Sequence, residues 1–281
     1  MIHSAIQLKA LVRNKSMGDS TKAQIIIRTY VMERFLERIA LSKYKNNFVL
    51  KGGFLISSIV GIDSRATMDI DGTIKNLPLT VGTTKSMIEE IIAISLEDNT
   101  NFSIIDIHEI MDEAEYGGIR ISLDAQIDGM KTPLKVDIST GDIITPREIS
   151  YQHRLLFEER SISVTAYNLE TVLSEKMEAI ISRGTANTRL RDFYDVYILQ
   201  AEGIIHIDYE MFKEAFAATT KKRHSAHLLE QGKLILQEIK DDDNMQNLWR
   251  SYQKKYDYSK EVSWQEVMQS VNNLFDSLSM R

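Results

Sequence analysis

Strict alternation of apolar and polar residues in the middle of the chain is the feature that most limits its fold. Residues 119–127, IRISLDAQI, place an apolar side chain at every second position, and residues 133–139, PLKVDIS, do the same. A period of two predicts half-buried strands. Between them stands Asp128-Gly129, a pair typical of tight hairpin turns. The sequence therefore predicts antiparallel strands with one buried face and one polar face.

Helix and strand patterns precede this region. Residues 22–42 and 82–98 carry apolar side chains at a spacing near 3.6, which predicts two helices. Residues 48–50, FVL, form a short apolar run that leads into Gly52-Gly53 and a further apolar helix. Residues 68–74, MDIDGTI, predict another strand. This order indicates an α/β domain with a mixed sheet.

Helical patterns dominate after Pro146, and strand signals largely stop there. The predicted helices cover residues 168–183, 189–200, 207–218, 226–239 and 264–278. The segments KDDDN (240–244) and KKYDYSKE (254–261) are interpreted as solvated connections. We therefore predict two domains: residues 1–150 as an α/β domain and residues 151–281 as a helical domain.

Composition narrows the possible functions. Among the 281 residues, 43% are hydrophobic and 26% charged, as in ordinary globular proteins. The absence of cysteine excludes disulfides, thiolate catalysis and cysteine-based zinc sites. No apolar run approaches the ~20 residues that span a bilayer, and the first residues lack the apolar segment of a signal peptide, so no membrane association and a cytoplasmic location are expected. With a net charge of −6, a polyanion would have to bind a local basic patch or metal ions.

Two aspartates one residue apart form the leading candidate site. On a strand, Asp69 and Asp71 lie on the same face, where their charges repel unless a cation or hydrogen-bond donors neutralise them. Asp137 occupies the polar face of its own strand and can supply a third carboxylate, although Asp124 and Asp128 are alternatives. Carboxylate oxygens suit Mg²⁺, which shares its ligand shell with substrate phosphates.

The motif DIDGT allows two interpretations. It resembles the opening motif of haloacid-dehalogenase-like phosphatases. In those enzymes a strongly apolar strand precedes the motif, whereas residues 64–67 of this chain are mostly polar. Gly52 and Gly53 instead follow a strand and begin a helix, where backbone N–H groups can approach phosphate oxygens. The order of elements resembles the polymerase-β-like nucleotidyltransferase core: a strand, a Gly-Gly pair, a helix and then a strand with Asp-x-Asp.

Lys176 lies within the apolar stripe of its predicted helix. A buried cation there requires an anion, which can be a nucleotide phosphate, Asp192 or Asp195; otherwise the side chain extends into water. The two aspartates lie one turn apart near a predicted helix start and can orient Lys176 or Arg183.

Arg65 and Thr67 precede the aspartates with the same alternation, and both are candidate nucleotide-binding residues. Arg65 can contact a triphosphate or pair with Asp69.

Three stretches carry a family resemblance: YVMERFLERIALSKYKNNFVLKGG, FVLKGGFLISSIVGIDSRATMDID and LSEKMEAIISRGTANTRLRDFYDVY. Over roughly residues 22–200 the chain resembles the AbiEii/AbiGii nucleotidyltransferase toxins of phage-defence, or abortive-infection, toxin–antitoxin systems. The resemblance implies that Asp69 and Asp71 bind the metal, Mg²⁺ or alternatively Mn²⁺, and that Lys176 and Asp192 belong to later motifs. Family members commonly carry Ser where Gly53 stands, so a hydroxyl contact to phosphate is lost here while the backbone N–H remains.

The function that follows is nucleotide transfer from a nucleoside triphosphate (NTP) to an acceptor hydroxyl. Residues 1–150, with their N-terminal helices, would be the catalytic domain, and the helical residues 151–281 would close the nucleotide cleft. Gly52 and Gly53 would hold the phosphates and Lys176 would neutralise them, while Asp137 completes the metal site or acts as the base. The resemblance implies a cognate antitoxin as partner and suggests tRNA as acceptor, for which the basic run at residues 221–223 offers faint support. The alternatives are a Mg²⁺-dependent phosphohydrolase and a nucleotide-binding growth regulator without catalysis.

Overall fold

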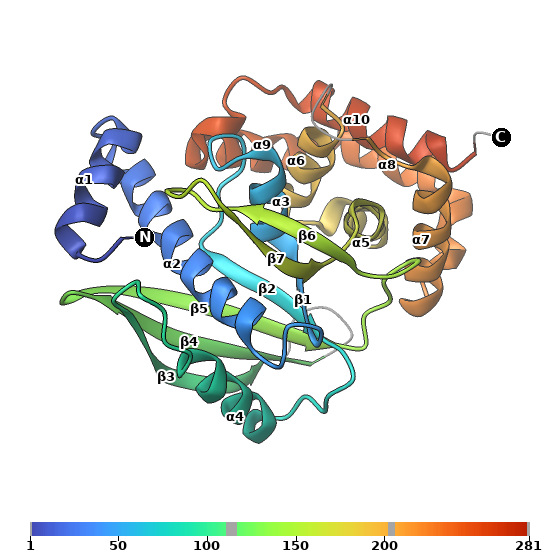
Figure 1. Ribbon diagram of the computed structural model, residues 1–281. Coiled ribbons are helices and arrows are strands. Elements are labelled where there is room, and N and C mark those ends of the chain that lie inside the picture. Colours follow the sequence, from blue (N-terminus) through green and yellow to red (C-terminus); the bar gives the residue numbers. More distant parts are fainter. Residues whose placement is uncertain (1, 111–116, 202–205, 280–281) are drawn as a thin grey trace. The chain divides into compact units, whose positions relative to one another are not determined.

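A computed structural model describes residues 2–110, 117–201 and 206–279 (Figure 1). The chain forms two compact units, which we describe separately. The first unit comprises Met1–Ile62, Ala66–Asp142 and Ile149–Ala166. The second comprises Asp63–Arg65, Ile143–Glu148 and Tyr167–Arg281.

A mixed sheet, with seven strands in the described part of the chain, forms the centre of the first unit. Its strand order is β3-β4-β5-β2-β1-β7-β6. The strands are β1 (Phe48–Lys51), β2 (Asp69–Ile74), β3 (Thr100–Ile110), β4 (Gly118–Ile127), β5 (Met130–Thr140), β6 (Ile149–Arg154) and β7 (Ser161–Ala166). Strand β2 runs parallel to β5, β1 runs parallel to β7, and the other neighbours are antiparallel. The predicted α/β class with a mixed sheet is confirmed.

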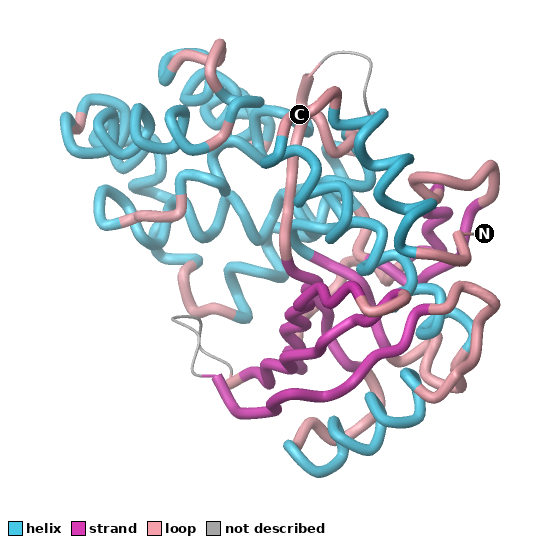
Figure 2. The backbone as a smooth tube through the Cα atoms, turned by 90° about the vertical axis from the view of Figure 1, so that its left-hand side faces the viewer, coloured by secondary structure: helices cyan, strands magenta, loops and turns pink. Residues whose placement is uncertain are grey.

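The two faces of this sheet differ in polarity, as the alternation predicts. Ile70, Val136 and Ile121 are fully buried on one face, and the intervening residues Asp71 and Asp137 are half-buried. Figure 2 shows the twist of the strands, drawn in magenta. The polar face therefore supplies the side chains of the candidate site.

Three of the four described helices of the first unit pack on its strands. The four helices are α1 (Ala5–Ser16), α2 (Ser20–Leu41), α3 (Gly52–Val60) and α4 (Val81–Ile92). Helix α1 packs on α2, whereas α2 packs against β5 and β7, α3 against β1 and β2, and α4 against β3. The long helix α2 begins at its cap Asp19, whose carboxylate accepts hydrogen bonds from the backbone N–H of Thr21 and Lys22 at 2.8 and 3.0 Å.

The predicted Asp-Gly hairpin is confirmed. Asp128 and Gly129 have φ angles of 46° and 81°, as a two-residue type I′ turn requires. The turn pairs Ile127 with Met130, and this fixes the register along the whole β4–β5 ladder.

The second unit is helical. Its elements are α5 (Leu169–Arg183), α6 (Leu190–Leu199), α7 (Tyr209–Lys222), α8 (Gly232–Asp241), α9 (Asp243–Lys255) and α10 (Trp264–Ser277), with short 3₁₀ turns at Gly184–Ala186, Ala226–Gln231 and Asp257–Ser259. Aromatic side chains join α6, α9 and α10: the ring centroids of Phe193 and Trp264 lie 5.5 Å apart, and those of Trp249 and Trp264 lie 6.0 Å apart.

Three expectations from the sequence are wrong in detail. Strands β6 and β7 follow Pro146 and join the sheet; β6 is an edge strand whose residues are mostly exposed, so it carries little apolar alternation. The helix expected at 82–98 ends at Ile92. The solvated segment KDDDN is helical rather than a loop: its first two residues end α8, and the Asp242 carboxylate accepts a hydrogen bond from Met245 N at 2.7 Å and caps α9, a helix that the sequence does not predict.

Gly232 offers a test of packing in the second unit. A Cβ atom added there would lie 2.3 Å from the ring of Phe275. We expect Gly232→Ala to lower the free energy of unfolding by about 1–3 kcal/mol through overpacking. Adding Phe275→Leu should recover part of that loss, measured by urea denaturation.

Gly82 provides the matched control. A Cβ atom there would have Thr80 Oγ1 at 4.0 Å as its nearest neighbour, and Gly82 lies in α4. Gly82→Ala should leave stability unchanged or raise it by up to about 1 kcal/mol. Equal losses for both variants would contradict the packing described here.

Candidate active site

The register between β2 and β5 brings two of the expected aspartates together. Asp71 is the direct partner of Asp137, and neighbouring strands lie about 4.8 Å apart. Asp69 lies two residues before Asp71, on the same face of β2. Of the rival third carboxylates, Asp124 lies on β4 opposite Pro133, and Asp128 lies in the hairpin turn. Strand β5, unlike β4, is a direct neighbour of β2, so the register favours Asp137.

Two cations flank this pair of carboxylates in the same row across the sheet. Lys51 on β1 is the partner of Asp71, and Arg120 on β4 is the partner of Asp137. Arg120 binds Asp137 through two hydrogen bonds of 2.8 and 2.6 Å. Lys51 Nζ donates to Asp142 at 2.6 Å and Ser139 at 2.8 Å. The positive charges offset the repulsion between the two central carboxylates.

Lys51, Arg120, Ser139 and Asp142 are not among the residues that the sequence analysis selects. Their signal is present but weak: Arg120 stands between Ile119 and Ile121 on the polar side of the alternation, and Lys51 directly precedes the glycine pair. Only the strand register shows that they share a row with the aspartates.

Gly52 makes room for Asp71, and Gly53 forms a hydrogen bond with it. Gly52 has a φ angle of +66°, and a Cβ atom there would lie 2.3 Å from Asp71 Oδ2. Gly53 N–H donates to the same oxygen at 3.1 Å. The positive end of α3 therefore stabilises the Asp71 carboxylate. The Gly53 N–H group, which is expected from the sequence to contact a phosphate, thus contacts a carboxylate here.

The carboxylates suit a hard divalent cation by residue type and backbone position. Asp71 and Asp137 face each other on neighbouring strands, with Asp69 on the same face, and all are oxygen donors of the kind that Mg²⁺ prefers. Within the ranges that the structure covers, no three histidine, aspartate or glutamate side chains converge into a metal-binding group. A bound ion would require Asp137 to give up at least part of its contact with Arg120.

The other expected residues belong to the second unit, where they form a buried cluster. Arg65 donates to Asp195 through Nε at 2.9 Å and Nη2 at 3.3 Å. Lys176 on α5 contacts the carboxylates of Asp192 and Asp195 on α6, the latter at 3.1 Å. The anions that contact Lys176 are thus these two aspartates, and Arg65 contacts Asp195 rather than facing solvent.

The mutual charges of this cluster shift the protonation equilibria of its members. Burial alone raises the pKa of Asp195, but Arg65 and Lys176 hold it below its usual value. Burial alone lowers the pKa of Lys176, but Asp192 and Asp195 raise it above its usual value. Asp195, Lys176 and Arg65 therefore stay charged at neutral pH, and the cluster fixes α6 against α5.

Thr67 and Arg183 are the remaining site residues expected from the sequence. Thr67 is buried in the first unit, just before β2. Arg183 is half-buried and ends α5, where a cation interacts favourably with the helix dipole. The structure thus groups Gly52, Gly53, Thr67 and the three aspartates in one unit. It groups Arg65, Lys176, Arg183 and Asp192 in the other.

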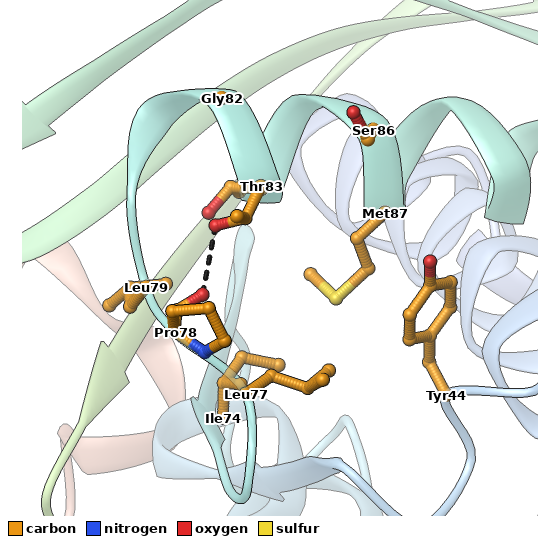
Figure 3. A pocket seen from close by; sticks show the side chains of 10 residues that line it. Tyr44, Ile74, Leu77, Pro78, Leu79, Gly82, Thr83, Ser86 and Met87 are labelled. Atoms are coloured by element: carbon orange, nitrogen blue, oxygen red, sulfur yellow. Dashed lines mark hydrogen bonds between the residues drawn. The ribbon is translucent and has the colours of Figure 1, made fainter.

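A separate cavity of about 330 Å³ lies in the first unit between α4 and the loop that follows β2 (Figure 3). Leu77, Met87 and the ring of Tyr44 face it, and Thr83 Oγ1 donates to the carbonyl of Pro78 at 2.8 Å. Its lining is apolar and carries no charged side chain. This cavity does not suit a triphosphate.

Comparisons with known proteins indicate the class of protein to which this chain belongs. The profile described as "Nucleotidyl transferase AbiEii toxin, Type IV TA system" matches residues 34–270, and no curated protein sequence matches. A Helicobacter pylori structure described as a "putative nucleotidyltransferase" is 17% identical, with a TM-score of 0.48, covering 91% of this chain and 96% of its own. JHP933 from the same species is 15% identical, with a TM-score of 0.49, covering 91% and 94%.

The profile match extends over most of the chain. This protein therefore belongs to the AbiEii family of nucleotidyltransferase toxins of type IV toxin–antitoxin systems. The family supports a transferase, and the family resemblance drawn from the sequence is confirmed. None of the described helices is long and apolar enough to cross a bilayer.

Asp195 tests the buried cluster. Asp195→Asn leaves Arg65 and Lys176 without their shared buried anion, so we expect the free energy of unfolding to fall by about 3–5 kcal/mol at neutral pH. The control Asp276→Asn breaks the exposed pair with Lys233, which should cost less than about 1 kcal/mol. Urea denaturation measures both.

The ionisation of Asp195 also determines how the stability of the protein should change at acidic pH. The folded-state pKa of Asp195 lies below its usual value, so the carboxylate stabilises the fold at neutral pH. This contribution is lost as the pH falls below about 4, through the lower folded value. Asp195→Asn should therefore show a shallower loss of stability on acidification than the wild type. Identical acid dependence would contradict the ionised cluster.

Proposed function

We propose that this protein transfers a nucleotide from an NTP to a hydroxyl group of an RNA acceptor. The observation that carries the proposal is the register of Asp71 against Asp137, with Asp69 on the same face, in a chain of the AbiEii family. Lys51 and Arg120 offset part of the repulsion between these carboxylates. Mg²⁺, or alternatively Mn²⁺, would bind their oxygens and offset the rest.

Asp69 and Asp71 would hold the metal, and Asp137 would complete the metal site or act as the base. When bound, the ion would neutralise the triphosphate and lower the pKa of the attacking hydroxyl. The Gly53 N–H group orients the Asp71 carboxylate. Lys51, the strand partner of Asp71, adds positive charge beside it. The chain's own residues thus orient the ligands before the substrate arrives.

The reaction would be an in-line displacement at the α-phosphorus of the NTP. The acceptor oxygen forms the new P–O bond while the bond from the α-phosphorus to the bridging oxygen of the β-phosphate breaks, and pyrophosphate leaves. The hydroxyl proton passes to a carboxylate, for which Asp137 is the candidate base. Lys176 and Arg183 are proposed to neutralise phosphate charge, with Asp192 orienting Lys176.

In the cell, the proposed role is that of the toxin in a toxin–antitoxin pair that arrests growth, in phage defence. Such a protein would act in the cytoplasm, where NTP and RNA are present, and would be opposed by its cognate antitoxin. The suggested acceptor is tRNA. The toxin role is supported by the family match, whereas phage defence, the cytoplasmic location and the tRNA acceptor are our proposals from the sequence resemblance.

Replacing the central carboxylates tests the proposal. Asp69→Asn or Asp71→Asn should lower transfer of label from α-labelled NTP into cellular RNA by at least about 10²-fold, because metal stabilisation contributes several kcal/mol. Both variants should also abolish growth arrest on expression.

Asp124→Asn is the matched control, because Asp124 lies on the polar face of β4 but opposite Pro133. It should behave as wild type. Growth arrest that survives in Asp69→Asn and Asp71→Asn would support a nucleotide-binding regulator and contradict catalysis as its cause.

Arg120 gives a test that does not depend on turnover. Its guanidinium occupies both oxygens of Asp137, so it competes with a divalent ion. We expect Arg120→Ala to bind Mn²⁺ about tenfold more tightly without NTP, measured by electron paramagnetic resonance, because one nearby positive charge is removed.

Arg120→Lys retains the charge and should remain close to wild type. Unchanged or weaker Mn²⁺ binding in Arg120→Ala would show that Asp137 does not belong to the metal site.

A further inference from the structure

An open groove in the second unit carries a different kind of chemistry from the carboxylate site. It lies between the start of α6 and the second half of α9 and has a volume of about 470 Å³. These two helices pack on each other (Figure 1). Arg191, Lys255, Tyr252, Tyr256 and Asp192 are among its lining residues. We call this the α6–α9 groove.

Two cations in the groove converge on one aromatic ring. Arg191 Nη2 donates to the hydroxyl of Tyr256 at 2.8 Å, and its guanidinium carbon lies 5.1 Å from the ring centroid. Lys255 Nζ lies 5.4 Å from the same centroid. Neither cation forms an ion pair with a carboxylate in the parts of the chain that the structure describes. Two like charges at one ring repel each other, and a bound anion would remove that cost.

The acidic residue of the groove does not cancel this positive charge. Asp192 is buried, and Lys176 neutralises its carboxylate. The groove therefore presents a net positive surface on a protein whose overall charge is −6. Local attraction of this kind is what a polyanion needs to bind such a chain.

The aromatic ring is held in place. Tyr256 packs against Tyr252 and Tyr258, with centroid distances of 4.7 and 5.4 Å. Tyr252 is buried, whereas Tyr256 is half-buried and borders the groove. A fixed, partly exposed ring beside unpaired cations is the combination that binds single-stranded nucleic acid, because bases stack on the ring while phosphates contact the cations.

The basic run at residues 221–223 is a weaker candidate. Arg223 forms ion pairs with Glu178 at 2.6 Å and with Glu175 at 3.5 Å. These carboxylates already compensate its charge. The run also lies at the end of α7, where positive charge is favoured by the helix dipole without any ligand.

We propose that the α6–α9 groove binds a single-stranded segment of the RNA acceptor. Arg191 and Lys255, which lie against the Tyr256 ring without RNA, turn to the RNA phosphates, and a base stacks on the part of the ring that they leave. This inference rests on the proposed function for the identity of the ligand, and it assigns the acceptor a binding surface distinct from the carboxylates of β2 and β5.

The test is binding of a short, fluorescein-labelled single-stranded RNA of mixed sequence to the full chain, measured by anisotropy without NTP or divalent metal. The double variant Arg191→Gln, Lys255→Gln should weaken binding at least about tenfold. The slope of log K against log salt should become shallower by about 1.4, since each phosphate contact on a single strand contributes about 0.7. Tyr256→Leu should weaken binding about tenfold through lost stacking.

Matched variants separate the groove from general effects. Tyr256→Phe keeps the ring and should bind RNA nearly as well as wild type. Lys221→Gln, Lys222→Gln changes the rival basic run by the same charge and should also bind nearly as well. Circular dichroism and thermal melting confirm that each variant is folded.

Several outcomes would overturn the groove assignment. Unchanged RNA affinity in the Arg191 and Lys255 double variant would do so, as would loss of affinity only in the Lys221 and Lys222 variant. Equal or tighter groove-dependent binding of poly-L-glutamate would indicate an acidic protein partner instead. Because the assay contains no NTP, these results are independent of whether nucleotide transfer occurs. RNA binding without transfer would refute the proposed function alone.

Discussion

The parallel pairing of β2 with β5 is the constraint on which the candidate site depends. It sets Asp71 directly opposite Asp137, about one strand spacing away, and the neighbouring ladders add Lys51 and Arg120 to the same row. A shift of one residue in any of these three ladders would turn the polar side chains of a whole strand to the buried face. The type I′ turn at Asp128-Gly129 fixes one of these ladders, and the close approach of Gly52 to Asp71 fixes the position of α3.

The second unit also holds aspartates that need neighbouring positive charges, but there the charges are buried. In the sheet, each of the two carboxylates borders a cation at the protein surface. Between α5 and α6, Asp195 is buried between Arg65 and Lys176, where an unpaired charge would be strongly destabilising. The same contacts position the start of α6, including Asp192 and the neighbouring Arg191 that faces the α6–α9 groove. Residues that the family resemblance marks as motif positions therefore also hold the helices together.

Much of the fold could be predicted from the sequence, because alternation and helical spacing are local signals. The β4–β5 hairpin and the shared face of Asp69 and Asp71 depend only on residues close together in the chain. Register is not local: nothing in the sequence shows that Arg120 pairs with Asp137 or Lys51 lies beside Asp71. The partner of Arg65 lies 130 residues away, so the choice between a phosphate and a carboxylate stayed open. Strand β6 and helix α9 are not predicted because an exposed edge strand and an aspartate-rich helix cap resemble loops in composition. Strand β7 does alternate, with Ile162, Val164 and Ala166 buried, but its six residues are a short signal next to a long helical region.

Nucleotide transfer at the aligned carboxylates is the central claim, and the fate of the phosphates tests it most directly. The protein is incubated with Mg²⁺, cellular RNA and NTP labelled in parallel reactions at the α- or the γ-phosphate. Nucleotide transfer predicts that the α label enters RNA and the γ label appears in pyrophosphate, and that both signals disappear in Asp71→Asn. Release of the γ label as inorganic phosphate, with no α label in RNA, would contradict transfer and identify a phosphohydrolase.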